Sequence, residues 1–121
     1  MIDHTGVTVS DVKRSKAFYS AALAPIGYAV IMDIGLFAGF GVPPKPDFWI
    51  GQGKPNDPPT HVAFRVESRD LVDAFHRAAV AAGGKDNGQP GVRAQYHPNY
   101  YGAFVLDPDG HNIEAVCHTP A

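Results

Sequence analysis

The sequence contains a single cysteine, Cys117, which excludes a disulfide bond within the chain. A lone thiol is typical of proteins in a reducing compartment, so we expect a cytoplasmic protein. Lys and Arg form no run, and the formal net charge at pH 7 is −2. The chain therefore has no basic patch of the kind that binds nucleic acid or an anionic membrane, and we expect neither partner.

Long apolar runs are also missing. No segment approaches the roughly 20 apolar residues of a membrane-spanning helix. The first residues, Met-Ile-Asp-His-Thr, have neither the basic start nor the apolar core of a signal peptide. The chain has no Gly-rich phosphate loop, no Gly-x-Ser-x-Gly and no Cys-x-x-Cys. The sequence therefore does not support phosphate-loop nucleotide binding, serine-hydrolase chemistry or thiol-redox chemistry.

Glycine and proline are plentiful, with 13 and 11 residues, which indicates many turns and short strands. Residues 3–9 alternate loosely and predict a strand. Ser10 is the predicted N-cap of a helix that carries Asp11 in its first turn and ends near Ala24. Short apolar segments then predict strands at 28–34, 36–42 and 47–50, followed by a linker at 51–59 that is rich in Gly and Pro.

The second half of the chain repeats the first. A strand is predicted at 60–66, Ser68 is a second N-cap, and a helix with an apolar stripe runs to about Ala82. A shift of 57 residues superimposes identical residues from the two halves, at His4/His61, Val9/Val66, Ala17/Ala74, Phe18/Phe75, Ala21/Ala78, Ala22/Ala79, Ala24/Ala81 and Gly27/Gly84. We interpret the chain as one domain of two strand–helix–strand–strand–strand modules, at about 2–53 and 60–118, with an extra loop at 85–96 in the second.

One such module cannot close a core by itself. Two modules together predict an α+β fold in which eight strands form an open barrel with both helices outside. In the opening strands, Val7 and Val9 of the first module and Val62, Phe64 and Val66 of the second are expected against the helices. Alternation then directs another set of side chains into the barrel: His4, Gly6, Thr8, His61, Ala63 and Arg65.

The last two predicted strands flank Asp-Pro-Asp-Gly at 107–110, which has the composition of a type I turn. If Leu106 pairs with His111 across a four-residue loop, Glu114 lies opposite Ala103 and shares its face with Tyr101. A carboxylate within an apolar strand is rarely buried without a partner or a cation. Glu114 is therefore either an exposed residue on an outer face or part of a functional cavity.

An inward Glu114 would join the two histidines inside the barrel. Two imidazoles and one carboxylate form a facial triad that binds a divalent transition metal and leaves coordination positions open. The pseudo-two-fold repeat supports this interpretation, because it brings equivalent positions to one axis. We predict that His4, His61 and Glu114 bind a divalent metal such as Fe, Mn, Ni or Zn.

The His-initiated strand, the Phe-bearing helix, the paired modules and the Asp-Pro-Asp-Gly-His-Asn-Ile-Glu ending resemble the vicinal oxygen chelate superfamily. This group includes glyoxalases, bleomycin-resistance proteins and extradiol dioxygenases. The resemblance covers about residues 2–118 and implies metal ligands at His4, His61 and Glu114. It also implies a small-molecule substrate that binds the metal through neighbouring oxygens, with stabilisation of an enolate or oxyanion. By this resemblance we expect an enzyme (a lyase, an isomerase or a dioxygenase) that forms a homodimer.

Several other residues are candidates for contacts with the substrate. The assumed hairpin register makes Tyr101 a candidate, with a catalytic role beside Glu114. Strand alternation makes Arg65 a second candidate. Trp49 is expected near the place in the first module that corresponds to Glu114 in the second. The long loop of the second module contributes three further candidates: Arg93, Tyr96 and His97.

The sequence departs from the glyoxalase pattern in one respect. Glyoxalase-type sites are expected to carry a carboxylate from both modules, and residues 47–52 contain no matching Glu. This argues against a glyoxalase acting on glutathione hemithioacetals, and the length argues against a ring-cleaving dioxygenase. The alternative to an enzyme is a metal-independent, bleomycin-resistance-type module that sequesters a small hydrophobic or aromatic compound. The barrel can close within one chain or by exchange between two chains.

Overall fold

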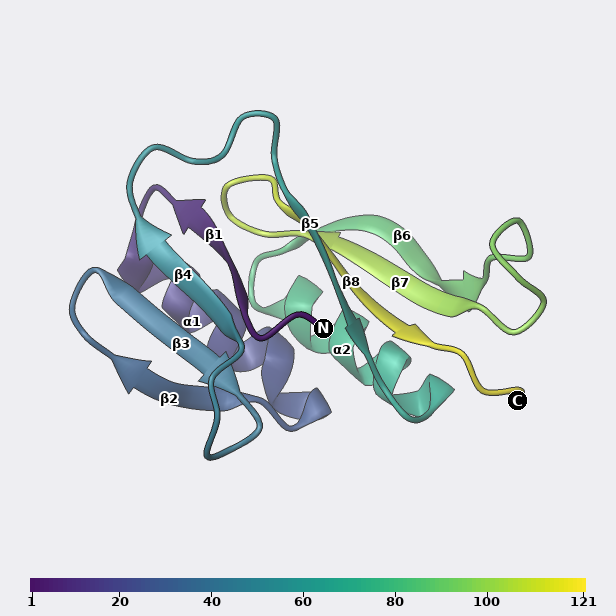
Figure 1. The fold of residues 1–121 in the computed structure, drawn as a ribbon. Helices are drawn as coiled ribbons and strands as arrows, with labels where there is room; N and C mark the ends of the chain where they lie inside the picture. The colour runs from purple at the N-terminus through teal and green to yellow at the C-terminus, as the bar shows by residue number, and fades with distance from the viewer.

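The chain, described over all 121 residues by a computed structural model, folds as two βαβββ modules side by side (Figure 1). The first module contains β1 (Thr5–Val9), α1 (Val12–Leu23), a 3-10 turn η1 (Ala24–Ile26), β2 (Ala29–Asp33), β3 (Phe37–Gly41) and β4 (Phe48–Gln52). The second contains β5 (His61–Arg65), α2 (Arg69–Ala81), β6 (Lys85–Val92), β7 (Tyr101–Leu106) and β8 (Asn112–Cys117). Neither helix is long and apolar enough to cross a membrane.

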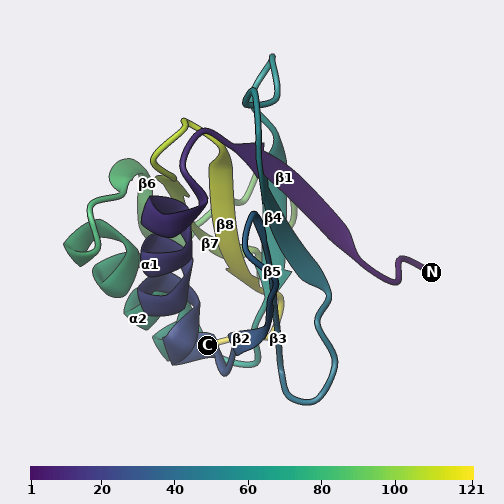
Figure 2. The same ribbon diagram turned by 90° about the vertical axis from the view of Figure 1, so that its left-hand side faces the viewer.

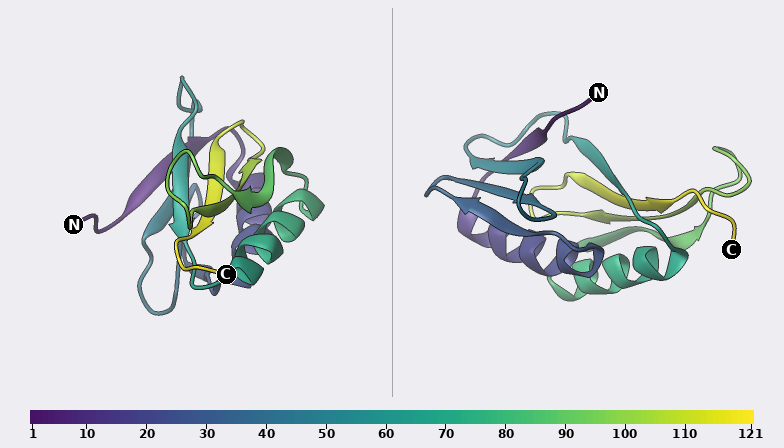
Figure 3. Two further views of the ribbon diagram at one scale, coloured as in Figure 1. Left: turned by 90° about the vertical axis from the view of Figure 1, so that its right-hand side faces the viewer. Right: turned by 60° about the horizontal axis from the view of Figure 1, so that its bottom comes forward.

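Each module forms its own four-stranded sheet, with the strand orders β1-β4-β3-β2 and β5-β8-β7-β6. The first and last strands of a module pair in parallel, and its other pairs are antiparallel. The two helices contact each other and cover the same side of the molecule (Figure 3). The predicted α+β fold of two modules with outer helices is confirmed. The two sheets remain open, because no ladder joins the edge strands β1 and β5.

The helix sides of both sheets bury one continuous apolar core. Val7, Val9, Phe64 and Val66 are at most 7% exposed, as strand alternation predicts. Aromatic rings join the modules, since the ring centroids of Phe48 and Phe64 lie 5.3 Å apart in an edge-to-face arrangement. The opposite faces of the two sheets carry no helix (Figure 3). We call them the open faces.

The strand ladders preserve the 57-residue offset between the modules. Gly6 of β1 pairs with Trp49 of β4, and the equivalent residue of β5, Ala63, pairs with Glu114 of β8. Trp49 therefore occupies in the first module the place that Glu114 occupies in the second, as the sequence predicted. The modules share a backbone plan but present different chemistry at this position.

Helix α1 begins with a different cap from the one predicted. Its N-cap is Asp11, whose carboxylate accepts from two backbone N–H groups of the first turn. Ser10 does not take this role because its hydroxyl donates to Asp109 Oδ1 over 2.6 Å. Helix α2 follows its predicted N-cap, Ser68.

Part of the loop expected at 85–96 is a strand. Residues Lys85–Val92 form β6, which pairs with β7 through two register irregularities around Gly88. Bulged pairing tolerates the Gly and Pro residues that suggested a loop. Asp86 ties the strand to α2, because its Oδ1 accepts from His76 Nε2 (2.9 Å) and from the Gly88 N–H (3.0 Å). His76 is accordingly buried.

The β7–β8 turn closes one residue later than predicted. Leu106 pairs with Asn112, which leaves Asp107 to His111 in the loop. Asp107 Oδ1 supports this wider loop by accepting from the backbone N–H groups of Asp109 and His111, each at 2.9 Å. A shift of one residue moves each side chain of β7 to a new partner, so the predicted register was wrong.

The same turn fastens the second module to the first. The Tyr19 hydroxyl of α1 donates to Asp107 Oδ2 over 2.5 Å. His111, which is fully buried, donates from Nε2 to the Thr8 carbonyl of β1 (2.9 Å) and accepts at Nδ1 from the Thr60 N–H (2.9 Å). A carbonyl only accepts and an N–H only donates, so these partners fix a neutral imidazole with its proton on Nε2.

Removal of the Tyr19 hydroxyl should destabilise the contact between the modules. In Tyr19→Phe, the buried Asp107 carboxylate loses a hydrogen bond, so we expect the free energy of unfolding to fall by roughly 1–3 kcal/mol. Urea denaturation measures the loss. Tyr96→Phe is the matched control, because the Tyr96 side chain is 60% exposed. Equal stability of the two variants would contradict the assignment.

The contact between α2 and β6 should depend on pH. The hydrogen bond from His76, followed by the Gly88 N–H, holds the pKa of Asp86 below its usual 3.8. A lowered pKa in the folded state stabilises the fold above pH 3.8, and this contribution is lost as the pH falls from 3.8 through the lowered pKa of the folded state. Asp86→Asn should therefore be less stable than the parent protein at pH 7, with a difference that shrinks below about pH 4. Urea unfolding from pH 7 to pH 3 tests this, with the exposed Asp70→Asn as the control.

Candidate functional site

Two of the predicted metal ligands meet on the open face of the second sheet. Ala63 of β5 lies beside Glu114 of β8, and His61 projects from the same face of β5. The distance from His61 Nε2 to Glu114 Oε1 is 3.1 Å. The His61 side chain is 49% exposed and the Glu114 side chain only 2%. Glu114 is therefore a buried carboxylate with an imidazole partner, and not an exposed residue on an outer face.

The hydrogen bonds of His61 determine which ring nitrogen faces Glu114. Nδ1 lies 2.9 Å from the backbone carbonyl of Asn112, which only accepts, so Nδ1 carries a proton. A neutral imidazole then directs its Nε2 lone pair at the carboxylate. This arrangement is repulsive unless Nε2 binds a proton or the two groups share a cation.

The donor groups fit a divalent metal ion. Metal-bound histidines commonly donate their second ring N–H to a backbone carbonyl, as His61 does to Asn112. The 3.1 Å between His61 Nε2 and Glu114 Oε1 is close to the roughly 3 Å expected between neighbouring ligands that each lie about 2.1 Å from one metal ion. A chain by itself supplies one imidazole and one carboxylate to such an ion.

Tyr100, which the sequence analysis did not single out, completes the hydrogen bonding of Glu114. Its hydroxyl donates to Glu114 Oε2. Burial and then the hydrogen bond to Glu114 raise the pKa of Tyr100 well above its usual 10.0, so the hydroxyl keeps its proton at neutral pH. The correct hairpin register would have identified this residue, because alternation places positions 100, 102 and 104 on the face of Glu114.

Phe104 and Arg93 lie on the same open face. Phe104 pairs directly with Glu114, and its ring centroid lies 6.2 Å from that of His61. The Arg93 guanidinium lies 5.5 Å from the Phe104 ring centroid and donates to the Gln89 carbonyl over 2.7 Å. Arg93, a predicted substrate contact, thus places a positive charge over the Phe104 ring on this face.

His97 and Tyr96 reach this site only through Tyr100. Their ring centroids lie 5.4 and 4.8 Å from that of Tyr100. His97 Nε2 lies 2.8 Å from His118 Nδ1, and neither His97 nor Tyr96 bonds to Glu114. Both predicted residues therefore surround Tyr100 and do not contact the candidate metal ligands.

Tyr101 lies on the opposite face of β7. Its hydroxyl donates to Asp73 of α2 over 2.7 Å, and the Arg69 guanidinium lies 5.0 Å from its ring centroid. The role predicted for Tyr101 beside Glu114 was wrong, because it followed from a hairpin register displaced by one residue.

His4 lies apart from the His61–Glu114 pair. Its side chain is 61% exposed, and Nδ1 lies 2.7 Å from Asp3 Oδ2. No group of three or more His, Cys, Asp or Glu side chains within the chain is placed to hold a metal ion. The segment that precedes β1 extends away from the helices (Figure 2). A single chain therefore brings together two of the three predicted ligands.

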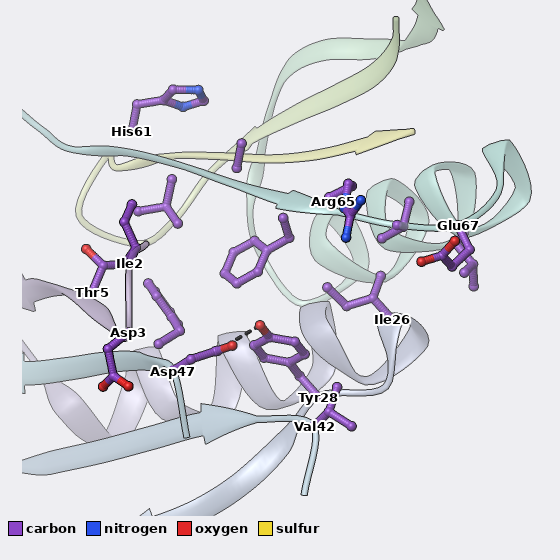
Figure 4. A pocket seen from close by; sticks show the side chains of 16 residues that line it. Ile2, Asp3, Thr5, Ile26, Tyr28, Val42, Asp47, His61, Arg65 and Glu67 are labelled. Carbon is purple, nitrogen blue, oxygen red and sulfur yellow. Dashed lines mark hydrogen bonds between the residues drawn. The ribbon is translucent and has the colours of Figure 1, made fainter. Parts of the chain in front are cut away.

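A cavity of about 640 Å³ lies between the facing edges of the two sheets (Figure 4). β5 forms one wall, to which it contributes Arg65. On the other side, the Tyr28 hydroxyl donates to Asp47 Oδ1 over 2.7 Å. Of the predicted site residues, only Arg65 and His61 line this cavity, and Glu114 does not.

The open face of the first sheet is apolar. Glycine provides the space for its aromatic rings: a Cβ at Gly39 would lie 2.9 Å from the indole of Trp49, and a Cβ at Gly51 would lie 2.8 Å from the ring of Phe37. Phe37 is 51% exposed and Met32 is 42% exposed. An apolar surface of this kind is typical of a binding or association site.

Comparison with known families agrees with this architecture. The family model of the Glyoxalase/Bleomycin resistance protein/Dioxygenase superfamily matches residues 33–115. The chain belongs to this superfamily. The matched region includes strands β3 and β4 of the first module and most of the second module. Glu114 lies near the end of the matched region. No curated protein matches the chain.

Several solved structures have the same fold. A glyoxalase/bleomycin resistance protein from Albidiferax ferrireducens T118 is 28% identical, with a TM-score of 0.78 over 97% of this chain and 98% of that one. A family enzyme from Burkholderia phytofirmans PsJN is 17% identical, with a TM-score of 0.76 over 98% of both chains. The fosfomycin resistance protein FosX from Mesorhizobium loti is 17% identical, with a TM-score of 0.72 over 98% of this chain and 92% of that one.

Proposed function

We propose that this chain is a metal-dependent enzyme of the superfamily, with His61 and Glu114 as two ligands and His4 of a second copy as the third. The His61–Glu114 pair is the observation that supports this most. The buried carboxylate of Glu114 faces Nε2 of His61, and 3.1 Å separates Oε1 from Nε2. The proton of the imidazole is on the other ring nitrogen, Nδ1, which donates to the Asn112 carbonyl. Fe, Mn, Ni and Zn all accept this set of ligands.

The geometry of the open faces favours a homodimer that completes the site. His4 precedes β1 as the first residue of the repeat, and its equivalent His61 begins β5, so each histidine belongs to the open face of its own sheet. The open face of the first sheet exposes Phe37 and Met32. If this face covers the open face of the second sheet in another copy, the apolar surface is buried and His4 approaches the His61–Glu114 pair.

The chemistry of the site suits a small substrate with two neighbouring oxygens. A divalent metal bound there would stabilise negative charge on a developing enolate or oxyanion. Arg93 adds positive charge on the same face, where it favours an anionic substrate. Phe104 lies opposite Glu114 on the neighbouring strand and adds an apolar ring to this face.

Trp49 indicates that the substrate has an apolar part. It stands where a second carboxylate would stand in a symmetric site, so the proposed metal has three protein ligands and keeps open positions. With Phe37, it offers aromatic rings on the face that would cover the second copy's His61–Glu114 pair. We infer that the substrate carries an aromatic or apolar group next to its oxygens.

Mixed dimers test whether the site is shared between two chains. A His4→Ala chain keeps an intact His61–Glu114 pair, and a Glu114→Ala chain keeps an intact His4. Either variant alone should lose stoichiometric metal, whereas a mixed dimer rebuilds one complete site and should regain one metal ion per dimer. Metal analysis of protein purified without chelator measures this content.

A matched control rebuilds no site: the His4→Ala chain is combined with a chain that carries both His4→Ala and Glu114→Ala. Metal at the parent level in His4→Ala alone, or a mixed dimer without metal, would overturn the proposed ligand set. A metal-free parent protein that still binds aromatic compounds would favour the bleomycin-resistance-type binding module.

The aromatic preference should reside in Trp49. Stacking on an indole is worth about 0.5–1.5 kcal/mol, so Trp49→Ala should weaken the binding of catechol to the metal-loaded protein roughly 2- to 10-fold. Binding of lactate, which has neighbouring oxygens but no ring, should change little. Isothermal titration calorimetry with both probes measures the difference, and Trp49→Phe should retain most of the affinity for catechol. An equal loss for both probes would contradict a stacking role.

A further inference from the structure

The two oxygens of Glu114 have different partners. Oε1 faces His61 Nε2 at 3.1 Å, and Oε2 accepts the hydroxyl proton of Tyr100. The carboxylate is thus divided between a candidate metal ligand on one side and a hydrogen-bond donor on the other. A carboxylate without such a donor is free to bind a metal through both oxygens.

Tyr100 is held firmly in this position. Its backbone N–H donates to the His97 carbonyl (3.1 Å), and its carbonyl accepts from the Arg93 N–H (2.7 Å). Its ring packs against three others, those of Tyr96, His97 and His118, with centroids 4.8 to 5.4 Å away. The backbone and the ring therefore both limit the movement of the hydroxyl.

Gly102 provides the room for this contact. A Cβ at this position would lie 3.2 Å from Glu114 Oε2 and 3.2 Å from Tyr100 Cε1. Any larger residue would press on both partners of the hydrogen bond. The strand therefore carries its smallest residue where the Tyr100 ring crosses toward the carboxylate.

We propose that Tyr100 is a positioning residue that reserves Glu114 Oε2 and leaves only Oε1 for the metal. The inference rests on the proposed metal function. A carboxylate that contributes one oxygen occupies one coordination position, so a set of two imidazoles and one carboxylate keeps three positions for substrate and water. Tyr100 would in this way determine how many substrate oxygens the site accepts, without contacting the substrate.

Cobalt binding by Tyr100→Phe tests this role. Loss of a hydrogen bond to a metal ligand typically weakens metal binding 10- to 100-fold, so Co²⁺ should bind about that much more weakly. The visible absorption of the saturated Co²⁺ protein should also change, because the freed Oε2 can enter the coordination sphere and alter its geometry. The titration uses the full chain and Co²⁺ alone, with no substrate.

Tyr101→Phe is the matched control. Tyr101 is the next residue, and its hydroxyl also donates to a carboxylate, that of Asp73, but from the helix side of the sheet. It should bind Co²⁺ with the affinity and spectrum of the parent protein. Equal behaviour of Tyr100→Phe and Tyr101→Phe would overturn the positioning role, whether both match the parent or both lose affinity.

A second variant keeps the test decisive if Tyr100→Phe folds poorly. Gly102→Ala leaves the hydroxyl in place but crowds it and Glu114 Oε2, so Co²⁺ affinity and spectrum should again change. An unchanged affinity and spectrum in a folded Gly102→Ala protein would count against the proposal. A parent protein that takes up no Co²⁺ would overturn the proposed metal function itself, whereas normal uptake by the parent and by Tyr100→Phe overturns only the role of Tyr100.

Discussion

The contact between the β7–β8 turn and the first module supports both the fold and the site. Asp107 and His111 are buried, and each bonds to the first module, at the Tyr19 hydroxyl and the Thr8 carbonyl. The same turn sets the register of β8 against β7, and through it the face on which Glu114 points. A change in this loop would therefore have two effects: it would alter the contact between the modules and the side chains that lie on the open face of the second sheet.

The repeat explains how one backbone plan provides two different surfaces. In the second module, the position beside the opening strand carries Glu114, and the open face is polar around His61. In the first module, the equivalent position carries Trp49. Its indole packs over Gly39, where a larger residue would clash with the ring. The two copies of the module thus differ on their open faces: one carries the His61–Glu114 pair and the other carries an apolar surface.

The fold could be predicted from the sequence because its signals are periodic. The 57-residue offset gave the two modules, and strand alternation gave the shared face of His61 and Glu114. The hairpin register could not be predicted, because the Asp107 side chain stabilises a longer loop than its turn residues indicate. Tyr101 was chosen and Tyr100 overlooked for that one reason. The repeat also predicted His4 beside His61 and Glu114, but within the chain His4 is exposed and lies apart from both residues.

The position of His4 has a practical consequence. It is the fourth residue of the chain, on a segment that extends from the body of the molecule (Figure 2). Residues fused ahead of Met1 would lie beside an exposed imidazole, and a polyhistidine tag there would bring competing nitrogen donors to it. The carboxyl terminus is no better a place for a tag, because it follows His118, whose ring centroid lies 5.4 Å from that of Tyr100. Recombinant protein for metal measurements is therefore better prepared with any polyhistidine tag removed.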